Sequence, residues 1–99
     1  MGKGWMAAQK EVAEAVFADL TDAFKAGTAS VDPANDPVLE RHRACIAAMW
    51  GRPCPPQAYA GVADLYLAHP DFRKNMDKRG PGFTDWLSAA MKSYAARFA

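Results

Sequence analysis

The sequence predicts an all-α fold, a bundle of about five helices around one core. Apolar residues recur at steps of three and four along most of the chain, as they do on the buried face of a helix. Glycine and proline clusters interrupt this pattern, and no stretch alternates as a strand does. A chain of 99 residues has room for a single hydrophobic core, so we expect one domain covering residues 1–99.

The first helix is expected from Trp5 to about Ala26. Its apolar stripe consists of aromatic and aliphatic side chains at helical spacing: Trp5, Met6, Val12, Val16, Phe17, Leu20 and Phe24. Gly27 ends it, and the segment "GTASVDPANDP" that follows has no usable period. This segment therefore predicts a loop of about ten residues, long enough to move.

The second helix is expected to begin with Asp36 as its N-cap and Pro37 in the first helical position. Its apolar face comprises Val38, Leu39, His42, Cys45, Ile46, Met49 and Trp50. It ends near Gly51, because the prolines of the segment "GRPCPP" lack the amide donors that a helix needs.

Proline also marks the remaining helices. The third begins near Pro56 and is broken at His69-Pro70, the fourth covers residues 70–76, and the last runs from Pro81 to Phe98. Four aromatic side chains on these and the first helix are expected in the core: Phe17, Phe72, Trp86 and Phe98.

The sequence "KRGPG" predicts a corner before the last helix. We expect Gly80 to adopt a left-handed conformation there and Gly82 to let two backbones approach closely. Asn75 and Asp77 have side chains suited to capping the free backbone groups of such a turn. The corner is therefore interpreted as a brace that fixes where the last helix starts.

The composition excludes several classes of protein. Twelve basic and eleven acidic residues leave a formal charge of +1, which gives no general attraction to nucleic acid or anionic lipid. No apolar run approaches the ~20 residues that cross a bilayer, and the two cysteines are too few for a disulfide framework. We expect a cytoplasmic protein. No nucleophile with a base in reach and no paired carboxylates point to an enzyme, and no cofactor is indicated.

Several aromatic residues are candidates for a binding site. Trp5, Trp50 and Tyr59 lie at the ends of expected helices, where pockets open, although aromatic stripes also build cores. His42 is expected to be a partly buried residue that hydrogen-bonds within the bundle, or equally to line a cavity. With Cys45, three residues further on, it offers only half of a metal site.

The two cysteines are interpreted differently. Cys45, on the core side, is expected to be a small inert apolar residue. Cys54 lies between prolines in a loop and is expected to be exposed, with an increased thiolate fraction beside Arg52. It is the candidate reactive thiol.

The chain resembles the TipAS antibiotic-recognition domain, the C-terminal effector half of thiopeptide-responsive activators of the MerR family. The resemblance rests on His42-Arg43, on Tyr66 followed by a short turn, on the string of Phe72, Asn75 and Asp77, and on Pro81-Gly82, with Trp5 and the long helix after it. It covers nearly the whole chain.

This resemblance implies a globin-like helical fold without haem and a cleft for large, mostly apolar, peptide-derived drugs. It also implies a regulator that is switched on by its ligand, dimerises, and contacts DNA through a separate N-terminal half absent from this chain. Family members that bind thiopeptides covalently carry a cysteine where this sequence has Gly61. Non-covalent recognition is therefore expected, with a ligand that need not be a thiopeptide.

We accordingly predict an effector domain that binds hydrophobic drugs in an aromatic cleft. The expected lining residues are Trp5, His42, Met49, Trp50, Tyr59 and Tyr66. Three alternatives stay open: a stand-alone drug-sequestering protein, a helical protein-interaction module, and a metal or redox sensor built from His42, Cys45 and Cys54.

Overall fold

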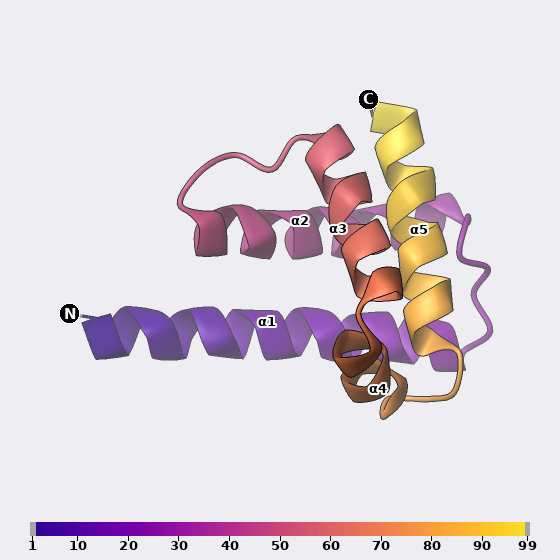
Figure 1. Ribbon diagram of the computed structural model, residues 1–99, viewed down its shortest axis with the longest axis horizontal. Helices are drawn as coiled ribbons and strands as arrows, with labels where there is room; N and C mark the ends of the chain where they lie inside the picture. Colours follow the sequence, from indigo (N-terminus) through magenta and orange to yellow (C-terminus); the bar gives the residue numbers. More distant parts are fainter. Residues whose placement is uncertain (1, 99) are drawn as a thin grey trace.

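The computed structural model describes the backbone of residues 2–98 and the side chains of residues 8–98. Within this range the chain forms five α-helices, one short 3-10 helix and no strand (Figure 1). The elements are α1 (Gly2–Lys25), η1 (Pro33–Asn35), α2 (Asp36–Trp50), α3 (Pro56–Ala68), α4 (Pro70–Asp77) and α5 (Phe83–Phe98). The predicted all-α fold of about five helices is confirmed. None of the described helices is long and apolar enough to span a bilayer.

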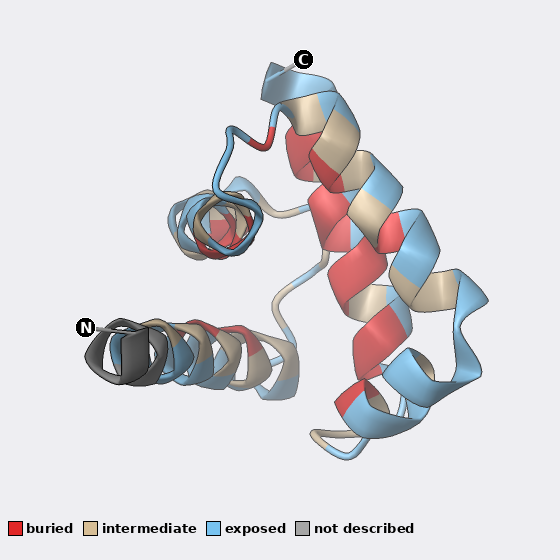
Figure 2. Cartoon of the chain, turned by 60° about the vertical axis from the view of Figure 1, so that its left-hand side comes forward, coloured by how far each residue is buried: buried red, intermediate tan, exposed pale blue. Residues whose placement is uncertain are grey.

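The helices form two crossed pairs. Helices α1 and α2 run antiparallel to each other, and α3 and α5 pack side by side across them (Figures 1 and 2). The second pair lies over the C-terminal part of α1 and the N-terminal part of α2, while the opposite ends of α1 and α2 extend beyond it. We call residues 16–25 and 36–43 the inner half of the α1/α2 pair, and residues 2–15 and 44–50 its outer half.

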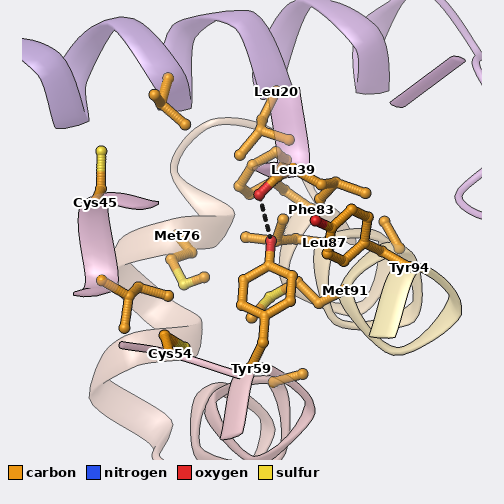
Figure 3. Packing of buried hydrophobic residues seen from close by; sticks show 14 residues of the cluster. Leu20, Leu39, Cys45, Cys54, Tyr59, Met76, Phe83, Leu87, Met91 and Tyr94 are labelled. Carbon is orange, nitrogen blue, oxygen red and sulfur yellow. Dashed lines mark hydrogen bonds between the residues drawn. The ribbon is translucent and has the colours of Figure 1, made fainter. Parts of the chain in front are cut away.

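The core lies where the two pairs cross. Leu20 of α1 and Leu39 of α2 are fully buried, and they meet Tyr59 of α3 and Phe83 of α5 (Figure 3). Leu87, Met91 and Tyr94 of α5 complete this face. Burial stops towards the outer half: no described residue of α1 before Val16 is buried, and the last buried residue of α2 is Ile46. The core therefore covers only the inner half and its border.

The prediction of burial in the core is wrong for two of the four aromatic side chains. Phe17 and Trp86 pack against the core as expected, and the indole N–H of Trp86 donates to the Thr28 carbonyl at 2.8 Å. Phe72 on the short helix α4 and Phe98 in the last turn of α5 are exposed instead, so their assignment to the core was wrong. Phe72 and Phe98 lie at the edge of the bundle, beyond the helices that cover the core. The periodicity of apolar residues along one helix does not show where that cover ends.

The helix boundaries between Gly27 and Pro56 follow the prediction closely. Gly51 adopts φ +68° and its amide bonds to the carbonyl groups at the end of α2, as a glycine that ends a helix does. The predicted loop contains η1, which Asp32 caps by accepting a hydrogen bond from the Ala34 amide at 2.9 Å. The N-cap of α2 is Asn35 rather than Asp36, and its buried side-chain amide donates to the Ala29 carbonyl at 2.9 Å. That bond folds the loop back on itself.

The corner before α5 differs from the prediction in two ways. Helix α5 begins at Phe83, not at Pro81, and it is Gly82 that has the left-handed conformation, with φ +87°. Gly80 is the site of close approach, because a Cβ there would lie 2.8 Å from Cε2 of Phe24. The two glycines thus exchange the roles expected of them.

Asp77 caps the start of α5 as predicted. Its carboxylate accepts hydrogen bonds from the backbone amide of Thr84 at 2.9 Å and from the Thr84 hydroxyl at 2.7 Å, and these bonds lower the pKa of Asp77. Asn75 is exposed and makes no side-chain hydrogen bond within residues 8–98, so its predicted capping role was wrong. The Asp77 carboxylate is therefore the side chain that caps the start of α5.

Candidate functional site

A groove of about 280 Å³ lies between α1 and α2, where the pair leaves the cover of α3 and α5. It is lined by Gln9, Val12, Arg41, Ala44, Cys45 and Ala48. Ala44 and Ala48 are four residues apart and therefore lie on one face of α2, where their methyl groups leave a shallow floor. Val12 of α1 faces this floor and is 50% exposed. The groove is thus mainly apolar and open to solvent.

One charged side chain lines the groove. Arg41 is the one lining residue of α2 that lies in the inner half, and its Nη1 donates to Oδ2 of Asp19 on α1 at 2.6 Å. Both side chains are about half exposed. An ion pair with this exposure stabilises a fold by at most about 1 kcal/mol. It therefore matters more for the charge it leaves beside the groove than for stability.

A buried polar cluster lies on the side of α2 that meets α3. His42 is 2% exposed, and its two ring nitrogens face two tyrosine hydroxyls of α3. Nδ1 lies 2.8 Å from the hydroxyl of Tyr59 and Nε2 lies 3.3 Å from that of Tyr66. The ring of Phe17 on α1 packs edge-on against the imidazole at 5.2 Å. The cluster therefore joins α2 to α3 and lies against α1.

The direction of each hydrogen bond in the cluster follows from the Leu39 carbonyl, which can only accept. The hydroxyl of Tyr59 donates to the main-chain carbonyl of Leu39 at 3.3 Å (Figure 3), so it accepts from Nδ1–H of His42. Nε2 is then the unprotonated nitrogen and accepts from the hydroxyl of Tyr66. Each polar group of the cluster has a partner, as a buried polar group requires.

Burial fixes the protonation state of this cluster. It lowers the pKa of His42 to about 4 and raises the pKa of Tyr66 to about 12. Burial also raises the pKa of Tyr59. All three groups are neutral near pH 7. An imidazole with a pKa near 4 is only a weak base at that pH, and both phenols keep their protons, so the cluster offers neither a base matched to neutral pH nor a phenolate nucleophile. Its geometry is that of a structural tie between helices.

Five of the six predicted lining residues have described side chains, and these five lie in two places. His42, Tyr59 and Tyr66 come together in the buried cluster, whereas Met49 and Trp50 lie at the outer end of α2, 72% and 38% exposed. The guanidinium of Arg52 lies over the Trp50 ring at 5.0 Å. Trp5 belongs to α1, but its side chain lies outside the described residues.

Of the residues that line the groove, the sequence analysis named only Val12, in the apolar stripe of the first helix, and Cys45. Arg41 and Gln9 were not named, and alanine gives no chemical signal. The repeat of small residues at Ala44 and Ala48, beside Cys45, is the pattern that indicates a shallow helix face.

Cys54 does not have the expected environment. It is 1% exposed, because Nη1 of Arg43 holds the Cys54 carbonyl at 2.7 Å and draws the loop onto the core. Burial raises the pKa of the thiol, although Arg43 and Arg52 oppose the shift. The expectation of an exposed thiol with an increased thiolate fraction was wrong.

Cys45 matches its expected place. It is buried at the floor of the groove, and burial raises the pKa of its thiol. Within the described residues, no three side chains of the metal-ligating types come together. Gly61 lies on the exposed face of α3, and a Cβ there would meet no atom within 4 Å.

The pattern of the family described as "TipAS antibiotic-recognition domain" matches residues 1–94. The "HTH-type transcriptional regulator SkgA" of Caulobacter vibrioides, in strains NA1000 / CB15N and ATCC 19089 / CIP 103742 / CB 15, is 33% identical over 93 residues. This match covers 94% of the present chain and 36% of the length of the relative. No solved structure matches the chain.

Proposed function

This chain belongs to the TipAS antibiotic-recognition domain family, and we propose that it is the ligand-binding effector domain of a transcriptional regulator. The relative is named a helix-turn-helix transcriptional regulator, and the chain matches 36% of its length. DNA contact would then belong to a separate N-terminal half of the MerR type, and the whole regulator would act as a homodimer in the cytoplasm. The domain itself would be the sensor and not an enzyme.

The ligand is an antibiotic-like hydrophobic molecule held in the groove between α1 and α2. The observation that carries this proposal is the combination of an apolar, open floor at Ala44 and Ala48 with the exposed side chains of Met49 and Trp50 immediately beyond it. A soluble helix pair gains by covering such a surface. Each stacked aromatic pair adds roughly 0.5–1.5 kcal/mol beyond the area it buries, and methionine adapts its shape to different ligands.

The six residues predicted from the sequence have different parts in this proposal. Trp50 and Met49 contact the ligand at the outer end of the groove, and Trp5, one helical turn before Gln9 in α1, is proposed to join them there. His42, Tyr59 and Tyr66 support the inner end from below. Their hydrogen bonds hold α2, which carries the floor of the groove, against α3.

Binding is proposed to be non-covalent. The thiolate is the reactive form of cysteine, and burial raises the pKa of both thiols in the chain, those of Cys45 and Cys54. Gly61, at the position where covalent family members have cysteine, provides no nucleophile. The candidate reactive thiol Cys54 would require the loop to leave the core before it could meet a ligand.

Fluorescence titration tests the proposal directly. Thiazole-containing peptides and other hydrophobic drugs are added to the purified domain, and the emission of Trp50 is expected to be quenched. Trp50→Ala and Met49→Ala should each weaken binding several-fold while the melting temperature stays within a few degrees. Saturating quenching that is unchanged in both variants, or no binding with a broad panel, would contradict the proposal. Global unfolding of Trp50→Ala would place Trp50 in the core.

A protein-interaction module is the second candidate. The exposed apolar side chains Val12, Met49 and Trp50 favour it, because a partner protein or a second copy would bury them equally well. Light scattering separates the two functions. Concentration-dependent dimers without any response to ligand would support the module, and a ligand-responsive monomer would exclude it.

A further inference from the structure

We propose that Arg41 determines the ligand class of the groove: it selects a flat apolar molecule that carries a neutral hydrogen-bond acceptor, such as a carbonyl oxygen or ring nitrogen, at its inner end. This inference rests on the proposed function, because it assumes that the groove takes a ligand. It concerns a residue that neither the sequence analysis nor the comparisons single out.

The position of Arg41 supports the inference. The guanidinium lies at the inner end of the groove, and the other residues of α2 in the lining are Ala44, Cys45 and Ala48, none of which carries a side-chain hydrogen-bond donor stronger than a thiol. Arg41 is therefore the charged group of the lining that a ligand lying along this floor would contact. The polar end of the ligand is therefore expected there, with its apolar body over the two alanines.

The hydrogen bonding of Arg41 leaves donors free for a ligand. A guanidinium has five N–H donors in a planar fork, and within the described residues only Nη1 makes a side-chain hydrogen bond, to Asp19. The other N–H groups have solvent on their side, because the side chain is 49% exposed. Arg41 thus offers a fixed donor group whose orientation Asp19 sets from α1.

The charge balance at this end decides the kind of acceptor. The Asp19 carboxylate lies 2.6 Å from Nη1 and largely compensates the positive charge of Arg41. A full anion approaching the remaining donors would also approach this carboxylate, and like charges repel. A neutral acceptor receives the same hydrogen bond without that repulsion. The pair therefore favours an uncharged acceptor over an anionic group on the same ring system.

Gln9 contributes a second, weaker preference. It lines the α1 wall of the groove further out than Asp19, and its side-chain amide can both donate and accept. A ligand with a second polar group partway along its length would meet it. The groove as a whole would therefore recognise a ligand with a hydrogen-bond acceptor at its inner end. A second polar group partway along the ligand, either donor or acceptor, would meet Gln9.

Three naphthalene dyes of similar size form the test. Prodan carries a carbonyl acceptor, N-phenyl-1-naphthylamine carries none, and 1-anilinonaphthalene-8-sulfonate is anionic. Fluorescence titration of the full chain measures the Kd of each. Arg41→Met should weaken Prodan by about fivefold or more, as expected for a half-exposed hydrogen bond to a charged group. It should leave N-phenyl-1-naphthylamine within about twofold of its original Kd, since that dye uses only apolar contacts.

Asp19→Asn is the complementary variant. It keeps Arg41 and removes the compensating charge, so the anionic dye should gain about threefold or more in affinity, and this gain should shrink in high salt. Arg97→Met is the matched control, because Arg97 pairs with Asp36 away from the groove. It should leave the Kd of each of the three dyes unchanged.

The outcomes separate this inference from the proposed function. If the native domain binds none of the dyes, the groove itself is not a ligand site and the proposed function fails. If the dyes bind but Arg41→Met weakens all three equally, or Asp19→Asn leaves the anionic dye unchanged, the groove stands and the role of Arg41 is overturned.

Discussion

The two halves of the α1/α2 pair have different environments, although they belong to the same two helices. The inner half lies beneath α3 and α5 and contains the fully buried residues Val16, Leu20 and Leu39. The outer half extends past them, and Val12, Met49 and Trp50 on it are exposed. The apolar periodicity is continuous from one half to the other. A continuous stripe therefore has one half buried in the fold and one half with exposed apolar side chains.

This difference indicates how a small domain can combine stability with binding. A 99-residue chain has little surplus core, so apolar residues that do not stabilise the fold need another explanation. The buried cluster of His42, Tyr59 and Tyr66 lies on the inner side of the border between the halves, where α2 meets α3, and the groove lies between the same helix and α1. Matched substitutions on the two sides of this border test the comparison.

The largest difference is expected between Leu39→Ala and Met49→Ala, both on α2. Leu39 is fully buried, so its truncation should lower the free energy of unfolding by about 3 kcal/mol. Met49 is exposed, and its truncation should change stability by less than about 0.5 kcal/mol. Urea denaturation of the two variants measures both values. Equal losses would show that the outer half is part of the core.

Acid should destabilise the inner half through His42. Its ordinary pKa of 6.5 falls to about 4 in the fold, because burial disfavours the charged ring. Above pH 6.5 the ring is neutral in the folded and unfolded chains, and between pH 6.5 and 4 only the unfolded chain binds the proton. The free energy of unfolding should therefore fall by about 3 kcal/mol as the pH drops through this window.

The control for this pH dependence is His42→Gln, which should be less stable at pH 7 but should lose the slope between pH 6.5 and 4. Asp77 does not interfere, because its pKa is lowered from 3.8 and its contribution is lost only as the pH falls below that value. A slope that persists in the variant would assign the acid sensitivity to another group.

A smaller effect is expected from the same substitution at two positions one turn apart. Val16 is fully buried and Val12 is 50% exposed, and both lie on α1. Val16→Ala should cost about 2 kcal/mol, whereas Val12→Ala should cost less than about 0.5 kcal/mol, since alanine also favours the helix. Thermal and urea unfolding give the comparison. Val12→Ala should instead weaken ligand binding, and a change in stability without any change in binding would reverse the assignment.

The smallest effects concern two glycines. An added Cβ at Gly80 would lie 2.8 Å from the ring of Phe24, so Gly80→Ala should destabilise by about 1 kcal/mol while the ring shifts. Gly61→Ala on the exposed face of α3 meets no atom within 4 Å and should stabilise by about 0.5–1 kcal/mol. Differential scanning calorimetry resolves shifts of opposite sign. Stabilisation by Gly80→Ala would show that the corner is loosely packed.

Local signals in the sequence predicted most of the helix boundaries. Gly51 and Pro56 act on the residues beside them, so the end of α2 and the start of α3 follow from backbone chemistry alone. The start of α5 was predicted wrongly, because two local rules give different answers at the corner before it. Pro81 is compatible with a helix start, but the left-handed backbone of Gly82 prevents a helix from including it, and α5 begins at Phe83.

The candidate site was predicted less well, because it depends on contacts between helices. Periodicity puts His42 on the inner face of α2, but it does not show that Tyr59 and Tyr66 of α3 meet its two nitrogens. Cys54 is buried because Arg43 reaches back to the loop, a contact between distant residues that spacing does not reveal. Arg41 lies beside Asp19 and the groove, and this arrangement of two helices cannot be seen from spacing along one of them.

Mapping of amide chemical shifts by NMR during titration with Prodan tests the central claim most directly. Binding in the groove should move the resonances of residues 9–12 and 41–50, while those of the buried faces of α3 and α5 change little. A saturable response centred instead on the shallow pocket between α3 and α5, at Gln57, Ala60, Lys92, Ala95 and Ala96, would contradict the account. So would the absence of any shift at saturating ligand.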